Sequence, residues 1–273
     1  MAITRENTLT YAGQVLAVFG AKAGVGCTTT AANLARALAM VHSQARVLVC
    51  DMSVAGSPLG NLYGTRALAF LSDLAANQNA SPEEMRSLLV EVADGVWLVN
   101  FAPPNDHSAT AAAAAALGLT RNYFDFTVLD CRHQLDTHTV NVLDAADRLL
   151  VLTEQKVPAL RAAQRTLNIF RRLGYSAEKI CLLLNRYEAD STLTMTEAAD
   201  VLKGDIFHKL PRDDNAIVQA ARQRALVVEV LPQPALAREF IELARKFPAP
   251  TQRPESHQYF TLVFSRKGHS TSP

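Results

Sequence analysis

A glycine-rich segment near the start of the chain constrains its fold more than any other feature. Residues 20–30 read Gly-Ala-Lys-Ala-Gly-Val-Gly-Cys-Thr-Thr-Thr. A phosphate-binding loop has the pattern G-x-x-x-x-G-K-[ST], in which backbone N–H groups cradle phosphates, the lysine reaches the β and γ oxygens, and the hydroxyl binds Mg²⁺. Gly26 and Thr28 occupy the closing positions, whereas Cys27 replaces the lysine and Ala21 replaces the opening glycine. The segment predicts nucleotide binding and leaves hydrolysis open.

The neighbours of this segment support the prediction. The apolar run 15–19 precedes it and suits a buried strand, and the Ala- and Leu-rich run 29–40 follows it and suits a helix. A strand, a glycine-rich turn and a helix together aim the free N–H groups of the helix N-terminus at an anion. An ordinary tight turn would not need Gly24, Gly26 and a run of hydroxyl residues together. The expected phosphate contacts are Ala21, Lys22, Ala23, Gly24, Val25, Gly26, Cys27, Thr28 and Thr29.

Composition excludes several other classes of protein. The chain has 273 residues, 49% of them hydrophobic, and a net charge of +1, so no global field favours nucleic acid or anionic lipid. No apolar run approaches the roughly 20 residues of a membrane helix, and the N-terminus does not resemble a signal peptide. Its four cysteines are widely spaced, which argues for a reducing cytosol and against disulfides or a zinc site.

Strand-like and helix-like runs alternate along the chain. Predicted strands cover 15–19, 46–50, 96–100, 124–129, 149–152, 179–184 and 206–210. Predicted helices cover 29–40, a segment opened by Ser81-Pro82-Glu83-Glu84, and 109–117, 158–173, 194–202, 215–224 and 234–246. Because several strands lack polar alternation, both faces of the sheet are expected to be covered. The pattern predicts an α/β fold: a doubly wound, mostly parallel sheet with helices on both faces.

The chain divides into three predicted parts. Residues 1–13 form an N-terminal extension, residues 14–247 form one nucleotide-binding domain, and residues 248–273 form a Pro-rich linker and a tail. An apolar stretch in the tail, at 257–264, needs a partner surface. It could pack on its own domain, bind another protein, or contact a membrane with the basic residues that follow it.

Polar residues end several predicted strands and should meet near the loop, because ligands bind at the carboxyl edge of such sheets. Asp130 can hold Mg²⁺ together with Thr28, or it can cap a helix or turn. Asp51 can orient water or Mg²⁺, or it can stabilise its own loop. Asn185 can bond the edge of a base, or it can form a turn. Pro211 ends another strand at the same edge.

Replacement of the loop lysine by Cys27 has a predictable cost. A hydrogen bond from a charged group is worth roughly 1.5–3 kcal/mol, so nucleotide binding should be about ten- to a hundredfold weaker. Lys22 or an arginine could compensate. Hydrolysis should suffer more than binding, because negative charge develops on the phosphate oxygens in the transition state.

These residues resemble the ParA/MinD family of deviant P-loop ATPases, whose loop reads KGGxGK[ST]. The upstream lysine that marks this family is Lys22, and the loss of the loop lysine resembles the CpaE/TadZ branch of pilus-assembly proteins. The resemblance runs from about Val15 to Phe247. Its segments begin at Val47 (VLVCDMSVAGSPLG), Phe124 (FDFTVLD), Leu143 (LDAADR), Thr153 (TEQKVPALR), Leu184 (LNRY) and Leu210 (LPRD).

The resemblance implies an ATP- and Mg²⁺-dependent sandwich homodimer. Lys22 would reach the partner's nucleotide, and Asp130 matches the Walker B aspartate. Asn185 and Pro211 fall where the family contacts adenine, with Arg186 beside them. The family's second strand usually ends Asp-x-Asp, but here its second aspartate is Ser53. With Lys22, Asp51 and Asp130 as the inherited catalytic set, turnover is expected to be weak or absent.

Four functions stay open. The first is a localisation or assembly factor for a Flp/Tad-type pilus or secretion machine, which binds protein partners at a pole or at the inner face of the membrane. The second is a DNA-partition ATPase, for which Arg161, Arg165 and Arg172 would supply part of a basic face. The third is a MinD-like membrane-cycling regulator anchored by the tail, and the fourth is a scaffold that binds no nucleotide.

Overall fold

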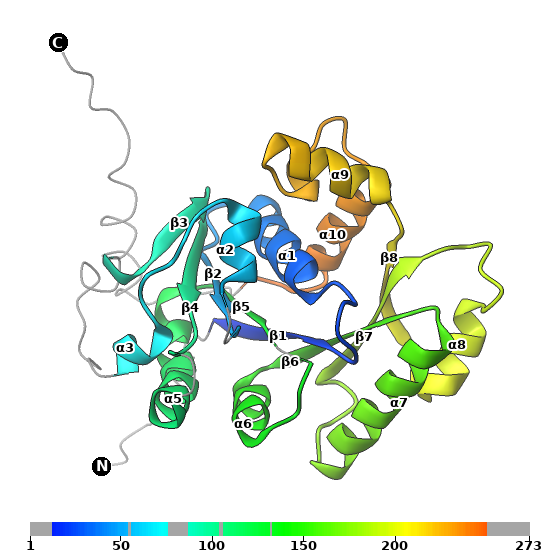
Figure 1. The fold of residues 1–273 in the computed structure, drawn as a ribbon, viewed down its shortest axis with the longest axis horizontal. Helices are drawn as coiled ribbons and strands as arrows, with labels where there is room; N and C mark the ends of the chain where they lie inside the picture. The colour runs from blue at the N-terminus through cyan, green and yellow to red at the C-terminus, as the bar shows by residue number, and fades with distance from the viewer. Residues whose placement is uncertain (1–12, 54–55, 76–86, 104–105, 132, 250–273) are drawn as a thin grey trace, which may run out of the picture.

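One sheet organises the part of the chain that the computed structural model describes, namely residues 13–53, 56–75, 87–103, 106–131 and 133–249 (Figure 1). The strand order is β3-β4-β2-β5-β1-β6-β7-β8. The strands are β1 (Gln14–Gly20), β2 (Val47–Asp51), β3 (Val90–Ala93), β4 (Val96–Asn100), β5 (Phe126–Asp130), β6 (Arg148–Glu154), β7 (Ile180–Tyr187) and β8 (Ile206–Pro211). Neighbouring strands are parallel except at the edge, where β3 runs antiparallel to β4.

Helices cover both faces of the sheet, which confirms the predicted fold class (Figure 1). One face carries α1 (Cys27–Val41), α2 (Pro58–Tyr63), α9 (Asp214–Gln223), the short 3₁₀ turn η1 (Val227–Glu229) and α10 (Ala235–Arg245). The other face carries α3 (Leu71–Ala75), α5 (His107–Tyr123), α6 (Thr137–Ala145), α7 (Val157–Arg172) and α8 (Met195–Leu202). Among the described residues, no helix is both long and apolar enough to cross a bilayer.

The central strand β1 separates two hydrophobic cores. Successive side chains of a strand point to opposite faces, so Leu16 and Val18 enter the core under α1, whereas Val15, Ala17 and Phe19 enter the other. All five are fully buried, which explains why β1 shows no polar alternation in the sequence.

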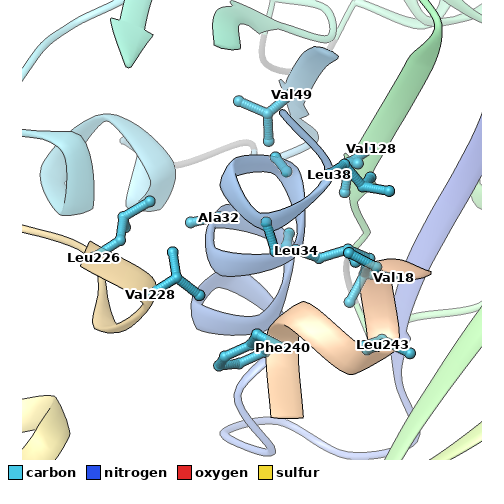
Figure 2. Packing of buried hydrophobic residues seen from close by; sticks show 14 of the residues in the cluster. Val18, Ala32, Leu34, Leu38, Val49, Val128, Leu226, Val228, Phe240 and Leu243 are labelled. Atoms are coloured by element: carbon cyan, nitrogen blue, oxygen red, sulfur yellow. The ribbon is translucent and has the colours of Figure 1, made fainter. Parts of the chain in front are cut away.

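The core under α1 fixes the direction of that helix. Leu34 and Leu38 of α1 pack toward the strand residues Val18 and Val128, and Phe240 of α10 closes another side (Figure 2). Burial of such a side chain contributes about 1.5–3 kcal/mol. Because this packing holds α1 against the sheet, the N-terminus of the helix stays at the carboxyl end of β1.

Five of the described elements were not predicted from the sequence: the short helices α2 and α3, the 3₁₀ turn η1, helix α6 and strand β3. Helix α6 begins after Asp136, whose carboxylate accepts a hydrogen bond from the N–H of Thr139, but its run of Thr and Val residues has low helix propensity. Strand β3 is short and lies at the sheet edge. Helix α5 is longer than the predicted 109–117 and continues through Gly118.

Some predictions fall where the structure gives no description. The helix opened by Ser81 and the apolar stretch at 257–264 both lie outside the described residues. The division into residues 1–13, 14–247 and 248–273 stays a prediction, although β1 begins at Gln14 and α10 ends at Arg245.

Candidate functional site

The glycine-rich loop joins β1 to α1 and leaves the start of the helix uncapped. Gly24 and Gly26 have φ angles of 80° and 96°, a left-handed conformation that favours glycine. Gly26 is the N-cap of α1, no side chain bonds the free N–H groups there, and the first turn holds no acidic residue. An uncapped N-terminus of this kind presents N–H donors and a positive helix dipole, which together attract an anion.

A cavity of about 470 Å³ opens beside this loop. It is lined by Lys22, Ala23, Gly24, Val25, Gly26, Cys27, Thr28, Thr29, Ser53, Asp130, Cys131, His133 and Gln134. The structure therefore brings the loop, the end of β5 and the segment after β2 to one place. Ala21 lies at the start of the loop, and its N–H bonds the carbonyl of Leu152, which anchors the loop to β6.

Within the cavity, Thr28 and Asp130 form a close pair. The Thr28 hydroxyl donates to Oδ2 of Asp130 at 2.7 Å, and Asp130 is only 7% exposed. Burial raises the pKa of Asp130 to about 7, the Thr28 hydrogen bond opposes that rise, and the charge of Asp51 adds to it. A hydroxyl and a carboxylate are oxygen donors of the kind that Mg²⁺ prefers. The residues present therefore fit a magnesium ion beside a phosphate.

Asp51 makes contacts that differ from those of Asp130. Its carboxylate accepts hydrogen bonds from the N–H of Ser53 (2.9 Å), the Ser57 hydroxyl (2.8 Å) and the N–H of Leu59 (3.0 Å). Both oxygens are thus occupied by the loop after β2, and Asp51 is not among the described residues that line the cavity. These contacts match the loop-stabilising alternative. Ser53, which that loop positions, faces the cavity instead.

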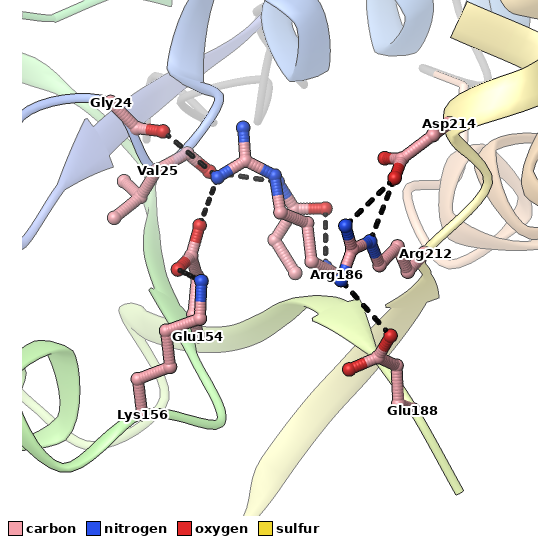
Figure 3. A network of polar contacts seen from close by, with 9 residues as sticks. Gly24, Val25, Glu154, Lys156, Arg186, Glu188, Arg212 and Asp214 are labelled. Carbon is pink, nitrogen blue, oxygen red and sulfur yellow. Dashed lines mark hydrogen bonds and ion pairs between the residues drawn. The ribbon is translucent and has the colours of Figure 1, made fainter. Parts of the chain in front are cut away.

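The end of β7 contacts the loop directly. Asn185 donates from Nδ2 to the carbonyl of Val25 at 2.7 Å, and Arg186 donates from Nη1 to the carbonyl of Gly24 at 3.2 Å (Figure 3). Arg186 also forms an ion pair with Glu154, whose carboxylate lies 3.1 Å from Nζ of Lys156. The sequence did not single out Glu154, because nothing in its neighbourhood predicts a partner 32 residues away.

Pro211 lies at the same edge of the sheet but outside the set that lines the cavity. It ends β8 opposite Tyr187 of β7. The next residue, Arg212, is 3.2 Å from a carboxylate oxygen of Glu188 and 2.8 Å from one of Asp214 (Figure 3). Asp51, Asp130, Asn185 and Pro211 all lie at the carboxyl edge of the sheet. Their predicted convergence near the phosphate loop holds only in part: Asp130 lines the cavity and Asn185 bonds the loop, whereas Asp51 and Pro211 are not among the described residues that line the cavity. Contact of Asn185 and Pro211 with a base, and nucleotide binding by Arg186, stay predictions.

Cys27 and Lys22 define the charge of the cavity. Burial raises the pKa of the Cys27 thiol well above its ordinary value, with the nearby Asp130 charge adding to the effect, so this side chain is neutral. Lys22 is exposed, lines the cavity, and forms no hydrogen bond or ion pair with another described residue. The cation of the loop is therefore Lys22, upstream of the position that a common phosphate-binding loop uses.

Three lining residues were missed from the sequence: Cys131, His133 and Gln134. The available signal was their position directly after Asp130, since the segment after a strand's carboxyl end lies at the ligand edge of a parallel sheet.

Comparison with known proteins agrees with this geometry. Residues 16–227 match the family described as the CobQ/CobB/MinD/ParA nucleotide binding domain. The septum site-determining protein MinD of Thermotoga maritima is 25% identical over 246 residues, which are 86% of this chain and 88% of that protein.

Two solved structures share the fold. The ParA family ATPase from Chlorobium tepidum has a TM-score of 0.75 and 22% identity, over 86% of this chain and 99% of that one. MinD from Pyrococcus horikoshii, complexed with Mg-ADP, has a TM-score of 0.68 and 20% identity, over 86% and 95%. The match over residues 16–227 shows that this chain belongs to the CobQ/CobB/MinD/ParA family of nucleotide binding domains.

Proposed function

We propose that this protein binds ATP with Mg²⁺ and acts as a nucleotide-gated homodimer that localises or assembles protein partners. Its binding is weak and its hydrolysis weak or absent. One observation carries the proposal. The cavity keeps the uncapped helix N-terminus and the Thr28–Asp130 pair of a phosphate site, but the cationic position of the loop is filled by the half-buried, neutral Cys27.

The phosphates and their metal ion would each have a matching set of groups. The first-turn N–H groups of α1 donate to phosphate oxygens, and Thr28 and Asp130 hold Mg²⁺. When bound, Mg²⁺ neutralises charge on the phosphates. Asp130 must lose its proton to serve as a ligand, so binding competes with the raised pKa of this carboxyl group.

Dimerisation is supported by the position of Lys22. This residue is exposed at the cavity and has no partner within the described chain, so its charge is available to a second copy that approaches the same edge of the sheet. A cation from a partner would supply charge that Cys27 does not. Nucleotide and partner subunit would then stabilise one another, which is the basis of a switch.

The biological role that we propose is assembly of a Flp/Tad-type pilus or a related secretion machine, with the protein in the cytoplasm, at a pole or at the inner face of the membrane. Support comes from the CpaE/TadZ-like loss of the loop lysine at Cys27 and from Ser53 in place of an aspartate. Ser53 lines the cavity, so its replacement of an aspartate removes a carboxylate from the phosphate site itself. Both changes favour a binding role over turnover.

DNA partition is the second candidate, because Arg161, Arg165 and Arg172 are exposed on α7. If these residues contact duplex DNA, affinity should fall steeply with salt concentration. The membrane-cycling alternative depends on the tail, which lies outside the described residues, and requires ATP-dependent sedimentation with liposomes.

The deciding experiment combines calorimetry with light scattering. ATP and ADP are titrated with and without Mg²⁺, and the mass is measured in each state. Saturable Mg²⁺-dependent ATP binding with a doubling of mass would support the switch. Binding without a change in mass would remove the dimer, and no binding at millimolar ATP would leave the scaffold alternative.

The pilus role needs a separate test in cells. A fluorescent fusion in the parent organism should form foci where the machine assembles, and deletion of the gene should remove the fibre. Uniform fluorescence together with normal fibres in the deletion strain would reject that role.

A further inference from the structure

Two neighbouring side chains of β7 fix two consecutive peptide groups of the phosphate loop. Asn185 bonds the carbonyl of Val25 and Arg186 bonds the carbonyl of Gly24, at 2.7 and 3.2 Å (Figure 3). Successive side chains of a regular strand point to opposite faces and could not both reach one loop. Here the register between β7 and β8 shifts between Leu184 and Tyr187, and such an irregularity re-aims side chains.

The backbone at this point is unusual as well. Arg186 has a φ of 50°, in the left-handed region that non-glycine residues seldom adopt. The Arg186 N–H donates a hydrogen bond of 2.9 Å to Oδ1 of Asn185, which supports this conformation. Strained backbone of this kind persists where surrounding contacts hold it and is often found at functional sites. The local conformation is therefore part of how the two side chains reach the loop.

Glu154 holds the Arg186 guanidinium in place. The Glu154 side chain is only 9% exposed, ends β6, and pairs with both Arg186 and Lys156 (Figure 3). A buried carboxylate paired with an arginine restricts the conformers of that arginine. Three elements (β6, β7 and the loop) are thus joined through one guanidinium.

These contacts set the direction of the loop's N–H groups. In a trans peptide the C=O and the following N–H point to opposite sides. When β7 holds the carbonyls of Gly24 and Val25, the N–H groups of Val25 and Gly26 turn away from β7. All three residues line the phosphate cavity, and their N–H groups are the donors that the inference concerns.

We propose that Asn185, Arg186 and Glu154 are positioning residues, which preorganise the phosphate loop and act on the phosphates through it. The sequence suggested contact with a base for Asn185 and nucleotide binding for Arg186. The inference rests on the proposed nucleotide binding. Donors that are already ordered lose less conformational entropy on binding than mobile ones. This smaller cost would partly offset the loss of affinity that comes from having Cys27 in place of lysine.

Tripolyphosphate separates loop positioning from base contact, because it has phosphates and no base. We would measure its affinity and that of ATP by calorimetry at fixed Mg²⁺, for the wild type, Asn185→Ala, Arg186→Met and Arg186→Lys. Positioning predicts that Asn185→Ala and Arg186→Met weaken both ligands by the same factor, about tenfold. Arg186→Lys should recover part of the loss, since lysine keeps a donor.

A matched control is Arg212→Met, which removes a nearby arginine that contacts Glu188 and Asp214 and has no contact with the loop. Its effect on either ligand should stay within roughly twofold. The direction in which Glu154→Gln changes the affinity for phosphate is the sharper test. Removing an anion near the site should tighten phosphate binding if charge alone matters, whereas loss of the anchor for Arg186 should weaken it.

The outcomes separate cleanly once thermal unfolding has shown that each variant is folded. A loss for ATP with no change for tripolyphosphate would show base contact and overturn the inference. Unchanged affinities, or tighter binding by Glu154→Gln, would overturn it too. If the wild type binds neither ligand, the proposed function itself fails and the inference falls with it.

Discussion

The hydroxyl of Thr28 donates a 2.7 Å hydrogen bond to Oδ2 of Asp130, and this bond joins the first turn of α1 to the end of β5. Both residues line the same cavity, so the two side chains that would hold Mg²⁺ already contact one another. The state of the Asp130 proton therefore matters both for the free protein and for ligand binding.

Stability should fall as pH rises through the interval between the unfolded and folded pKa values of Asp130. Burial raises the folded pKa to about 7, whereas an unfolded aspartate titrates near pH 3.9. The native state therefore holds more protons than the unfolded state across that interval. The contribution of Asp130 to the free energy of unfolding is fully present below about pH 4 and is lost as pH approaches 7. The total loss is roughly 2–4 kcal/mol.

Urea unfolding between pH 4.5 and 8 without Mg²⁺ would measure this effect as the difference between wild type and Asp130→Asn. The variant keeps the shape of the side chain but cannot titrate. The difference between the two proteins therefore removes the pH dependence that all other carboxylates contribute to both. Parallel pH profiles for the two proteins would contradict the raised pKa.

Gly26→Ala should destabilise the fold more than Gly24→Ala. Both glycines have left-handed φ angles, which cost an alanine about 1 kcal/mol. A Cβ at Gly26 would also lie 2.6 Å from Nδ2 of Asn185, whereas one at Gly24 meets nothing within 4 Å. We expect an additional loss of about 1–2 kcal/mol for Gly26→Ala, because Asn185 must then move and release Val25.

Chemical denaturation of the two variants checks this difference. Adding Asn185→Ala should remove the clash, so the double variant should lose less than the sum of the two single variants. Equal stabilities of Gly24→Ala and Gly26→Ala would mean that Asn185 does not pack against the loop.

The hydrogen bond between Asn185 and Val25 is a contact that could not be predicted from the sequence. The glycine pattern and the strand that precedes it predicted the loop, and the alternation of elements predicted that Asn185 would lie at the same sheet edge. The hydrogen bond from Asn185 to Val25 spans 160 residues and depends on an irregularity in β7 that no local pattern reveals. Strand ends could therefore be placed from the sequence, but the direction of their side chains could not.

Asp51 and Asp130 are a second example of side chains whose direction could not be predicted from the sequence. Each aspartate ends an apolar strand and each is buried. Asp130 faces the cavity because its partner Thr28 lies on α1, whereas Asp51 turns to the loop that follows it. The Ser57 hydroxyl and two backbone N–H groups satisfy Asp51, and these contacts appear only when the loop has folded.

Cys27→Lys should raise the affinity for ATP by about ten- to a hundredfold, which is the value of a charge-assisted hydrogen bond to phosphate. Position 27 lies in the first turn of α1 and lines the cavity, so a longer side chain has room to extend toward the ligand. Calorimetry with Mg-ATP would measure the gain. Cys27→Ala, which removes the thiol without adding charge, is the control. Equal affinities of the alanine and lysine variants would show that this position does not face the phosphates.

Asp51→Ala should destabilise the protein by about 2–4 kcal/mol, because it leaves the N–H groups of Ser53 and Leu59 and the Ser57 hydroxyl without their acceptor. Ser57→Ala removes only one of these donors and the N-cap of α2, so about 1 kcal/mol is expected. Urea unfolding of both variants measures the difference.

If Asp51 served mainly to orient water or Mg²⁺, Asp51→Ala would keep its stability and lose ATP binding. If Asp51 instead stabilises its loop, Asp51→Ala should lower the free energy of unfolding. At a low temperature where this variant is still folded, its ATP affinity should change only through displacement of Ser53.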